Sequence, residues 1–325
     1  LVPGIAESWS VADDGVTYTF KIREGAKFHS GNPITAEDAE FSIRRVIALE
    51  KTPSFILTQF GFTTENMEQT IKATGPYELT LVTDKPYAPS FVFNCLTAPV
   101  ASIVDKKLAM EHEKDGDFGY EWMKTNSAGS GAYSLRSWKP NESYVLDVNA
   151  DYWRGTPAMK RVFVQHVPES NSQRLALEKG DIDIARNLSP DDIAAISGTP
   201  GIKVEDDLKG RILYFSLNQK DERLSNPKVI EAFKYLVDYE GMSQSYSLNL
   251  EKAKALLAEA GYADGFDVQI YVRTDPQRLE VAQALQQVWA QVGIKAELVT
   301  GTGKQILTQY RARQHQIYLG AWGPD

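Results

Sequence analysis

The last third of the chain alternates strand-like and helix-like segments, and this alternation constrains the fold more than any other feature. Strand patterns at 266–273, 294–300 and 316–322 are separated by helix patterns at 276–293 and 303–314. A β-α-β-α-β order is the signature of a parallel sheet, because parallel neighbours need a long crossover connection. We therefore predict an α/β fold in which these three strands lie parallel in one sheet.

The carboxyl ends of these strands carry polar and aromatic residues. Arg273 ends the first strand and Gly301 follows the second. The third strand ends in Trp322 and Gly323 and, after one proline, Asp325. Right-handed crossovers keep the carboxyl ends of parallel strands on one edge of a sheet, and ligands of open α/β sheets bind outside that edge. We therefore expect a basic group, an acidic group and an aromatic ring to share one rim.

The first two thirds of the chain mix shorter strand and helix patterns. Thr35 and Asp38 have the spacing of a capping box, with Asp in place of the usual Glu or Gln, at the start of a helix pattern. Gly180 stops a second helix, and Ser189 with Pro190 starts a third. The predicted strands lie at 16–28, 77–83, 132–138, 144–153, 162–167, 182–185 and 212–218, and the predicted helices at 35–51, 172–179 and 250–261.

The composition argues against two classes of partner. The 325 residues carry a net charge of -8, and the lysines and arginines are interspersed with acids. Nucleic-acid binders usually show a basic stripe, which this sequence lacks. No apolar run approaches the roughly 18 residues of a membrane span. The single cysteine, Cys95, lies in an apolar stretch, and we expect it to pack in a core.

No group of residues predicts catalysis or metal binding. The four histidines are scattered, and none has ligand spacing to a second His or Cys. The sequence GTGK at 301–304 lacks the first Gly and the final Ser or Thr of a phosphate loop, and GSG at 129–131 is not a nucleophile elbow. The acidic pairs at 13–14 and 191–192 fit a turn and a helix start. We therefore expect binding rather than catalysis, with no cofactor and no metal.

The aromatic residues do not indicate a carbohydrate platform either. Four tryptophans fit the apolar periodicity of their segments, and we expect them in the core: Trp122, Trp138, Trp153 and Trp289. The other two, Trp9 and Trp322, lie near the ends of predicted elements.

Several stretches also carry a family resemblance. They are GIAESWSVADDG and its continuation to residue 45, GSGAYSLRSW and its continuation to residue 185, EKAKALLAEAG at 251–261, and LGAWGPD at 319–325. Together they resemble the family-5 extracytoplasmic solute-binding proteins of ABC importers, the dipeptide, oligopeptide and nickel group. Ser130 and Ala132 stand where this family more often has Thr and Pro.

The resemblance implies a fold and a domain organisation. The fold is a two-lobed, type II-like periplasmic-binding-protein clamp with an inserted subdomain and parallel-rich sheets flanked by helices. By position, residues 1–128 would be the inserted α/β subdomain, 129–222 part of the first lobe and 223–325 part of the second lobe, with the ligand cleft between the lobes. It also implies further segments before residue 1, at 242–247 and after residue 325.

The resemblance further implies a ligand site. Peptide binders of this family place Trp-x-x-Asp at the end of a second-lobe strand, where the Asp holds the peptide ammonium, and Trp322 and Asp325 match this pattern. A ligand ammonium would offset the cost of a buried acid, and Gly323 would let a ligand backbone approach closely. Dipeptide binders also use an Arg for the ligand carboxylate just before a helix, and Arg273 lies close to that place.

The expected function follows from this resemblance. It is that of a periplasmic or membrane-associated extracytoplasmic receptor, monomeric and non-enzymatic, which captures a peptide-like or other amine-bearing solute and delivers it to an inner-membrane ABC permease. Three alternatives stay open. They are a nickel-chelate, sugar or opine receptor on the same fold, an α/β enzyme with its active site in further segments, and a receptor-like periplasmic chaperone.

Overall fold

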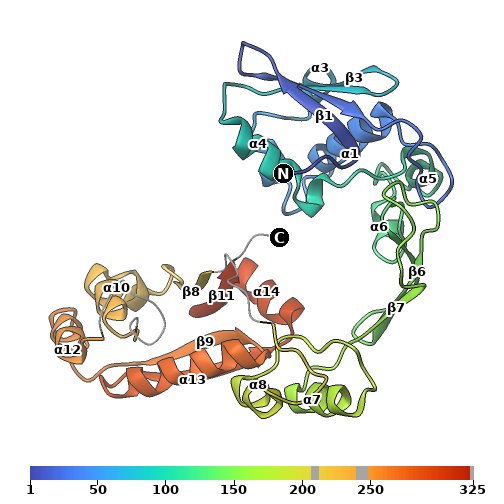
Figure 1. Cartoon of the computed structure of the whole chain (residues 1–325). Coiled ribbons are helices and arrows are strands. Elements are labelled where there is room, and N and C mark those ends of the chain that lie inside the picture. The colour runs from blue at the N-terminus through green and yellow to red at the C-terminus, as the bar shows by residue number, and fades with distance from the viewer. Residues whose placement is uncertain (206–211, 239–247, 323–325) are drawn as a thin grey trace. The chain divides into compact units, whose positions relative to one another are not determined.

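The computed structural model describes residues 1–205, 212–238 and 248–322 and divides into two compact units (Figure 1). Unit 1 is Leu1–His166, and unit 2 begins at Val167. The mixed α/β class predicted from the sequence is confirmed. The described helices include none that is long and apolar enough to cross a bilayer.

A four-stranded antiparallel sheet forms the centre of unit 1. Its order is β1-β2-β4-β3, and the strands are Ala6–Val11 (β1), Thr17–Ile22 (β2), Glu78–Val82 (β4) and Ile71–Gly75 (β3). Along β2, Tyr18, Phe20 and Ile22 alternate with more exposed residues and are buried. The period of two puts these side chains on one face of the sheet. That face builds the core of unit 1.

Helices α1 (Ala36–Leu49) and α4 (Pro89–Leu96) contribute to this core. The predicted capping box at Thr35 and Asp38 is confirmed. The Phe93 ring of α4 lies 5.6 Å from the Trp9 ring and 5.9 Å from the Tyr18 ring, which joins the helix to the strands. The shorter helices of unit 1 are α2 (Phe55–Thr58), α3 (Met67–Thr70), η1 (Pro99–Ala101), α5 (Lys106–Glu111) and α6 (Tyr120–Met123).

The remaining sheet of unit 1 is antiparallel and three-stranded, with β6 (Ser143–Val148) between β5 (Tyr133–Lys139) and β7 (Arg161–Gln165). Trp138 of β5 pairs with Tyr144 of β6, and Trp138 is 45% exposed. The prediction that Trp138 lies in a core is wrong. Neither apolar core cluster of the described chain includes a side chain from these three strands. The alternation in β5 therefore marks a strand face that the described residues leave uncovered.

Unit 2 contains the predicted parallel sheet. Its order is β10-β9-β11-β8, formed by Lys295–Gly301 (β10), Asp267–Arg273 (β9), Ile317–Trp322 (β11) and Ile212–Leu217 (β8). The first three strands are parallel, as predicted, and β8 joins them antiparallel to β11. The strand predicted at 182–185 is absent from the described structure, where those residues are neither helix nor strand.

Helices cover both faces of this sheet (Figure 1). Helices α10 (Pro227–Lys234), α12 (Leu250–Glu259) and α13 (Pro276–Ala290) bury one face around Trp289, which has no exposed surface. Helix α14 (Gly303–Arg311) carries Tyr310 to the ring of Tyr318, which lies on the opposite face of β11. The other helices of unit 2 are α7 (Ser170–Lys179), α8 (Pro190–Ile196) and α9 (Glu222–Ser225).

The boundary between the two compact units lies after residue 166 of the sequence, whereas the predicted parts have boundaries after residues 128 and 222. Lobes of a clamp are defined by how they move, so the division into 1–128, 129–222 and 223–325 stays a prediction. The further segment predicted at 242–247 falls outside the described residues. Cys95 lies in α4 and is half-buried against the unit 1 core, where burial raises the pKa of its thiol.

Candidate ligand-binding edge of the unit 2 sheet

The register of the unit 2 sheet brings three strand ends to one edge. Leu319 of β11 pairs with Val272 of β9, and Gly301 of β10 pairs with Arg273 of β9. Since all three strands are parallel, their carboxyl ends lie side by side. The prediction that Arg273 and Trp322 end strands on the same edge is therefore confirmed for the described residues.

These two side chains also lie on the same face of the sheet. In β11, Ile317 and Leu319 belong to the apolar core, so Trp322 alternates to the other face. In β9, Val272 belongs to that core, so Arg273 also points away from it. Trp322 is 60% exposed. The remaining predicted site residues, Gly323 and Asp325, lie outside the described residues.

The guanidinium of Arg273 is packed against the start of α14. A methyl group at Gly303, the first residue of that helix, would lie 3.5 Å from the Arg273 guanidinium carbon. Within the described ranges the buried Nε of Arg273 has no hydrogen-bond partner. The residue as a whole is only half-buried, its guanidinium stays charged at all relevant pH values, and a buried polar atom without a partner costs stability. A ligand carboxylate would supply that partner.

The start of α14 adds to the positive character of this edge. Thr302 and Gln305 form a capping box, which explains the glycine-rich sequence at 301–304 as a strand-to-helix turn. The amino-terminal end of a helix carries a partial positive charge. Gly303 brings this end against Arg273 because it has no side chain to separate them.

Three tyrosines lie next to the edge, on the same face. The Tyr318 ring is 4.3 Å from the Tyr310 ring and 6.2 Å from the Tyr214 ring. Gly320 lies between them, and a Cβ atom there would come within 2.5 Å of Tyr318 Cε1 and 2.8 Å of the Tyr214 hydroxyl oxygen. Glycine is therefore required for the two rings to converge. Sequence reasoning missed Tyr214, because its strand joins the sheet antiparallel from far earlier in the chain.

The ionisable groups of this face respond to burial. Burial raises the pKa of Tyr214, with nearby Tyr310 and Tyr318 acting in the same direction and Arg273 and Arg278 in the opposite one. Burial also lowers the pKa of His315, and Arg313 contributes to that shift. Both groups are therefore neutral near pH 7. Arginine supplies the charge on this side of the sheet.

Arg278 provides a contrast to Arg273. It lies in the first turn of α13 and is 9% exposed. Its Nη1 donates to Asp275 Oδ2 at 2.5 Å, and its backbone amide donates to the same carboxylate. Its charge is therefore matched inside the protein, whereas Arg273 forms no ion pair with any residue in the described part of the chain.

The acidic pairs at 13–14 and 191–192, which the sequence assigned to a turn and a helix start, have structural roles. Asp192 accepts hydrogen bonds from Ser170, Ser189 and Arg174, and these bonds, the Ser170 bond first, lower the pKa of its carboxyl. Asp14 accepts from the amides of Val16 and Thr17 in a turn. The described ranges contain no group of three or more residues that could hold a metal ion.

The fold and this edge define an α/β protein with an arginine and an aromatic side chain where parallel strands end, which is where ligands of open α/β sheets bind. The chain belongs to the bacterial extracellular solute-binding proteins, family 5, whose model matches residues 1–249 and 242–325.

Curated relatives support the same family. The chain is 28% identical over 349 residues to the probable D,D-dipeptide-binding periplasmic protein DdpA of Escherichia coli K12, an alignment that covers 99% of this chain and 65% of that protein. It is 26% identical over 367 residues to the dipeptide-binding protein of the same organism, covering 100% of this chain and 68% of that one. It therefore spans about two thirds of the length of these relatives.

Solved structures confirm the fold of periplasmic binding proteins. The binding protein DppA of Helicobacter pylori, in complex with the peptide STSA, matches with a TM-score of 0.86 and 24% identity over 100% of this chain and 70% of that chain. The binding protein AgaA of A. tumefaciens R10, in complex with agropinic acid, matches with a TM-score of 0.79 and 23% identity over 98% of this chain and 67% of that chain.

Proposed function

We propose that this protein is the substrate-binding receptor of an ABC importer and that it captures a peptide-like or other amine-bearing small solute. The observation that carries the proposal is the Arg273 guanidinium, which has no partner within the described residues at the carboxyl edge of a parallel sheet. A solute carboxylate would pair with it, and Trp322, on the same face, would cover the bound solute.

The opposite end of the solute would be recognised by Asp325. In the sequence Asp325 follows β11 by three residues, a carboxylate matches an ammonium group, and Gly323 would allow the solute backbone to approach. An amino group at one end and a carboxylate at the other are the two termini of a peptide, which is why we favour peptides over other solutes.

The partners and the location follow from the same role. We propose a monomeric receptor in the periplasm, or held at the outer side of the membrane, which delivers its solute to an ABC permease in the inner membrane. It would not be an enzyme. As in a clamp, two lobes would close on the solute, and ligand contacts would shift the balance between open and closed forms.

One alternative has a specific observation in its favour. Any solute with a carboxylate would suit Arg273, and the protein AgaA, which shares the fold, is named in complex with agropinic acid. An opine, or a nickel chelate that contains a carboxylate, would therefore suit the same framework, and a sugar receptor stays an alternative on the same fold. An α/β enzyme and a periplasmic chaperone are the rivals from other classes. Saturable one-to-one binding without turnover separates a receptor from both.

Calorimetry tests whether Asp325 binds the amino group of the solute. We would titrate the dipeptide Ala-Ala and its N-acetylated form into the wild type and into Asp325→Ala. Losing one partner of a buried charge pair costs roughly 2–5 kcal/mol, so Asp325→Ala should weaken Ala-Ala binding between tens and thousands of fold, at about 1.4 kcal/mol per tenfold. The acetylated peptide should bind the wild type weakly and the variant no better. Equal binding of both peptides by the wild type would rule out that Asp325 recognises the free amino group.

A further inference from the structure

Unit 1 contains a pocket that the proposed function does not use. It lies beside the last two turns of α1 and has a volume of about 240 Å³. Its lining comes from four stretches, which are 42–49 of α1, 51–53, 99–104 and Tyr120 at the start of α6. All of them belong to unit 1, whereas Arg273 belongs to unit 2.

Two cationic side chains line this pocket, and none of its described lining residues is acidic. Nε of Arg45 donates to the Phe118 carbonyl oxygen at 2.9 Å, which fixes the guanidinium beside the pocket. Nζ of Lys51 lies 5.6 Å from the centre of the Tyr120 ring, a distance at which a cation is attracted to an aromatic face. Contacts within unit 1 therefore hold both positive charges at the pocket.

The charge of Arg45 is not matched by any residue that the structure describes. Within those residues the guanidinium forms no ion pair, and Nε makes its only hydrogen bond. Arg44, the preceding residue of α1, is the opposite case, because it pairs with Glu40 at 2.5 Å and donates to the carbonyl oxygens of Glu68 and Ile71. Burial lowers the pKa of Arg45, because its guanidinium has lost part of its hydration. The two terminal nitrogens of Arg45 are therefore available to an acceptor on a ligand.

The acids around the start of α6 already have partners. Asp117 raises the pKa of Arg45 through its charge, but its carboxylate accepts hydrogen bonds from three backbone amides. Glu121 pairs with Lys124 at 2.5 Å. The carbonyl groups at the end of α1 add about half a negative charge, which two cations exceed. An anion is therefore the occupant that would balance the charge of this pocket.

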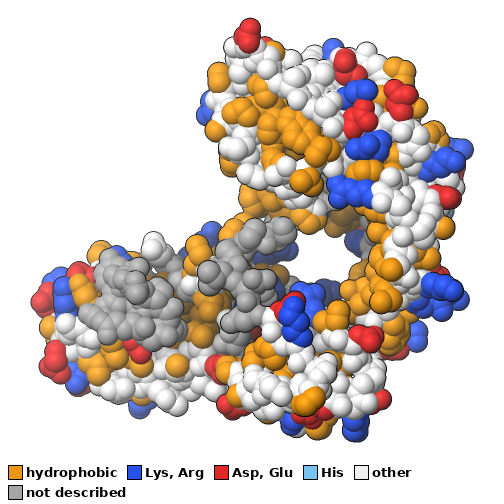
Figure 2. All heavy atoms as spheres, viewed as in Figure 1, with side chains coloured by type: hydrophobic (Ala, Val, Ile, Leu, Met, Phe, Trp, Pro, Cys, Tyr) orange, Lys and Arg blue, Asp and Glu red, His pale blue; other side chains and the backbone are white. Residues whose placement is uncertain are grey.

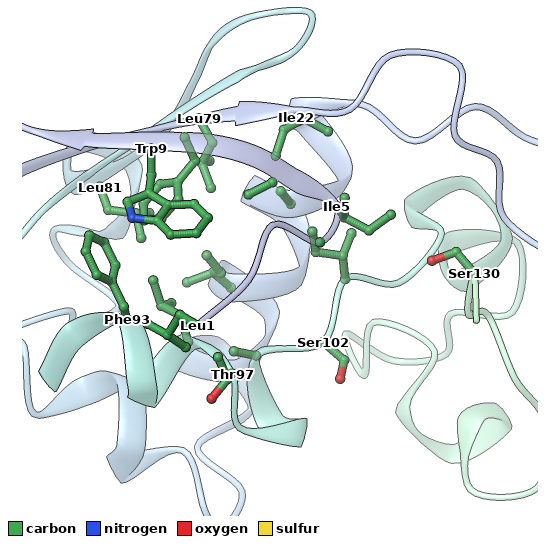
Figure 3. A pocket seen from close by; sticks show the side chains of 18 of the residues that line it. Leu1, Ile5, Trp9, Ile22, Leu79, Leu81, Phe93, Thr97, Ser102 and Ser130 are labelled. Atoms are coloured by element: carbon green, nitrogen blue, oxygen red, sulfur yellow. The ribbon is translucent and has the colours of Figure 1, made fainter. Parts of the chain in front are cut away.

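The rest of the lining is mainly apolar. Its apolar members are Val46, Leu49, Pro53, Pro99, Val100 and Val104. Thr52 and Ser102 add hydroxyl groups at exposed positions. Ser102 also borders a larger hollow of unit 1, in which the side chains labelled in Figure 3 are aliphatic, aromatic or hydroxyl-bearing and none is charged. The two cations therefore distinguish the pocket beside α1.

We propose that the pocket beside α1 is a second binding site, which takes a small organic anion with one carboxylate and a short apolar body. The planar guanidinium of Arg45 would hold the carboxylate through two parallel hydrogen bonds. Lys51 would add its charge, and the apolar side chains would cover the body of the ligand. The pocket is smaller than the roughly 300–1,000 Å³ of most ligand sites, so the anion would be smaller than a drug-sized molecule. A strongly hydrated inorganic anion would lose more hydration than these walls could replace.

Fluorine NMR tests this assignment on the whole chain. The probe is 4-fluorobenzoate, and 4-fluorobenzamide is its neutral analogue of the same shape. We expect saturable binding of the benzoate and binding of the benzamide that is weaker by about tenfold or more. Inorganic phosphate should displace the probe less well than unlabelled benzoate does. Equal binding of the two probes, a signal that never saturates, or better displacement by phosphate would overturn the proposal.

Two variants locate the bound probe. Arg45→Met removes the guanidinium and should weaken 4-fluorobenzoate by about tenfold or more. Lys51→Glu reverses the charge at an exposed position and should weaken it by about fivefold. The matched controls are Arg44→Met, whose charge has its own partner, and Lys124→Glu, which lies 5.0 Å from the same Tyr120 ring but outside the lining. At about 0.15 M salt, which screens exposed charges beyond roughly 8 Å, both controls should bind nearly as the wild type does.

A third variant separates this site from the edge of the unit 2 sheet. Arg273→Met lacks the guanidinium proposed to bind the solute carboxylate, and saturable binding of 4-fluorobenzoate should persist in it. Loss of all binding in Arg273→Met would assign the probe to unit 2 and overturn the proposal.

The outcomes for the unit 1 variants also differ. If Arg45→Met fails to fold, as judged by circular dichroism, Lys51→Glu and Lys124→Glu decide the question. Wild-type affinity in a folded Arg45→Met variant would overturn the proposal, as would equal losses in Lys51→Glu and Lys124→Glu. A loss confined to Arg45→Met and Lys51→Glu supports it.

Discussion

The two units differ in how many of their buried polar groups have hydrogen-bond partners. In unit 1 the acid Asp105 is 1% exposed and accepts hydrogen bonds from Ser30, Asn32 and the Leu108 amide. In unit 2 the apolar core is filled around Trp289. Buried polar atoms without a partner, counted within the described residues, are Arg273 Nε, Arg278 Nε, Gln309 Oε1 and His315 Nδ1 in unit 2, and His29 Nδ1 in unit 1.

This difference bears on function. Buried polar groups without partners and unfilled apolar space both cost stability, so proteins keep few of either. Among the unmatched polar atoms of unit 2, the Nε of Arg273 lies where the parallel strands end. We infer that unit 2 leaves open at Arg273 what a solute would complete. The surface, in contrast, mixes charges of both signs in the view of Figure 2 and offers no broad basic face there.

The largest expected effect is on the core of unit 2. Trp289→Ala removes a ring that packs 4.8 Å from the Phe233 ring and donates from Nε1 to the Leu236 carbonyl oxygen at 3.2 Å. We expect a loss of about 3–5 kcal/mol in the free energy of unfolding, measured with denaturant. Trp138→Ala is the matched control, because Trp138 is 45% exposed, and should cost about 1 kcal/mol or less. Similar losses in the two variants would mean that Trp289 is no better packed in the unit 2 core than Trp138 is on the uncovered face of β5.

A somewhat smaller effect is expected at the buried acid of unit 1. Asp105→Ala leaves its three donors without their acceptor, and we expect a loss of about 2–4 kcal/mol in the free energy of unfolding. Asp14→Ala is the control, since Asp14 also accepts three hydrogen bonds but lies in an exposed turn, and it should cost less. A larger loss in Asp14→Ala than in Asp105→Ala would contradict the view that the stability of unit 1 depends on the hydrogen bonds of its buried acid.

The stability of unit 1 should also depend on pH through Asp105. Burial alone would raise the pKa of this carboxyl, but hydrogen bonds from Leu108, Ser30 and Asn32 outweigh it and lower the pKa from 3.8. A lowered pKa in the folded state stabilises the fold above the unfolded value and loses that contribution as pH falls through the folded value. Unfolding midpoints measured below pH 4 should therefore fall less steeply in Asp105→Ala than in the wild type. Parallel curves would exclude this role.

The smallest expected effect on stability concerns Gly320. Gly320→Ala places a Cβ atom 2.5 Å from Tyr318 Cε1, so the tyrosine rings must move, at a cost of about 1–3 kcal/mol. The control is Gly75→Ala in β3, where the nearest atom would be an ordinary 3.7 Å away. Thermal unfolding compares the two variants. A neutral Gly320→Ala would show that the aromatic group beside the edge is loosely packed.

The sequence predicted the parallel part of the unit 2 sheet because its signals are local. Each strand is followed by a helix with its own start signal, and crossovers between parallel strands have one hand. That order alone placed Arg273 and Trp322 on one edge, and the pairing of Leu319 with Val272 bears this out. Asp325 was placed by family resemblance and lies outside the described residues.

Other features depend on contacts that no local pattern encodes. Strand β8 pairs with β11 from far earlier in the chain, so Tyr214 could not be assigned to the site from the sequence. The alternation around Trp138 correctly indicated a strand, but burial requires a layer to cover that strand, and sequence periodicity does not say whether one exists. Arg278 and Arg273 look alike in the sequence. Only the helix start at Asp275 distinguishes the matched charge from the unmatched one.

The contrast between these two arginines leads to the measurement that tests the central claim most directly. Calorimetric titrations would compare Ala-Ala with its carboxyl-terminal amide in the wild type, Arg273→Met and Arg278→Met. If Arg273 holds the solute carboxylate, the amide should bind the wild type at least tenfold more weakly, at about 1.4 kcal/mol per tenfold. Arg273→Met should bind both peptides equally weakly, whereas Arg278→Met should keep the wild-type preference for the free carboxylate. An undiminished preference in Arg273→Met would contradict the account.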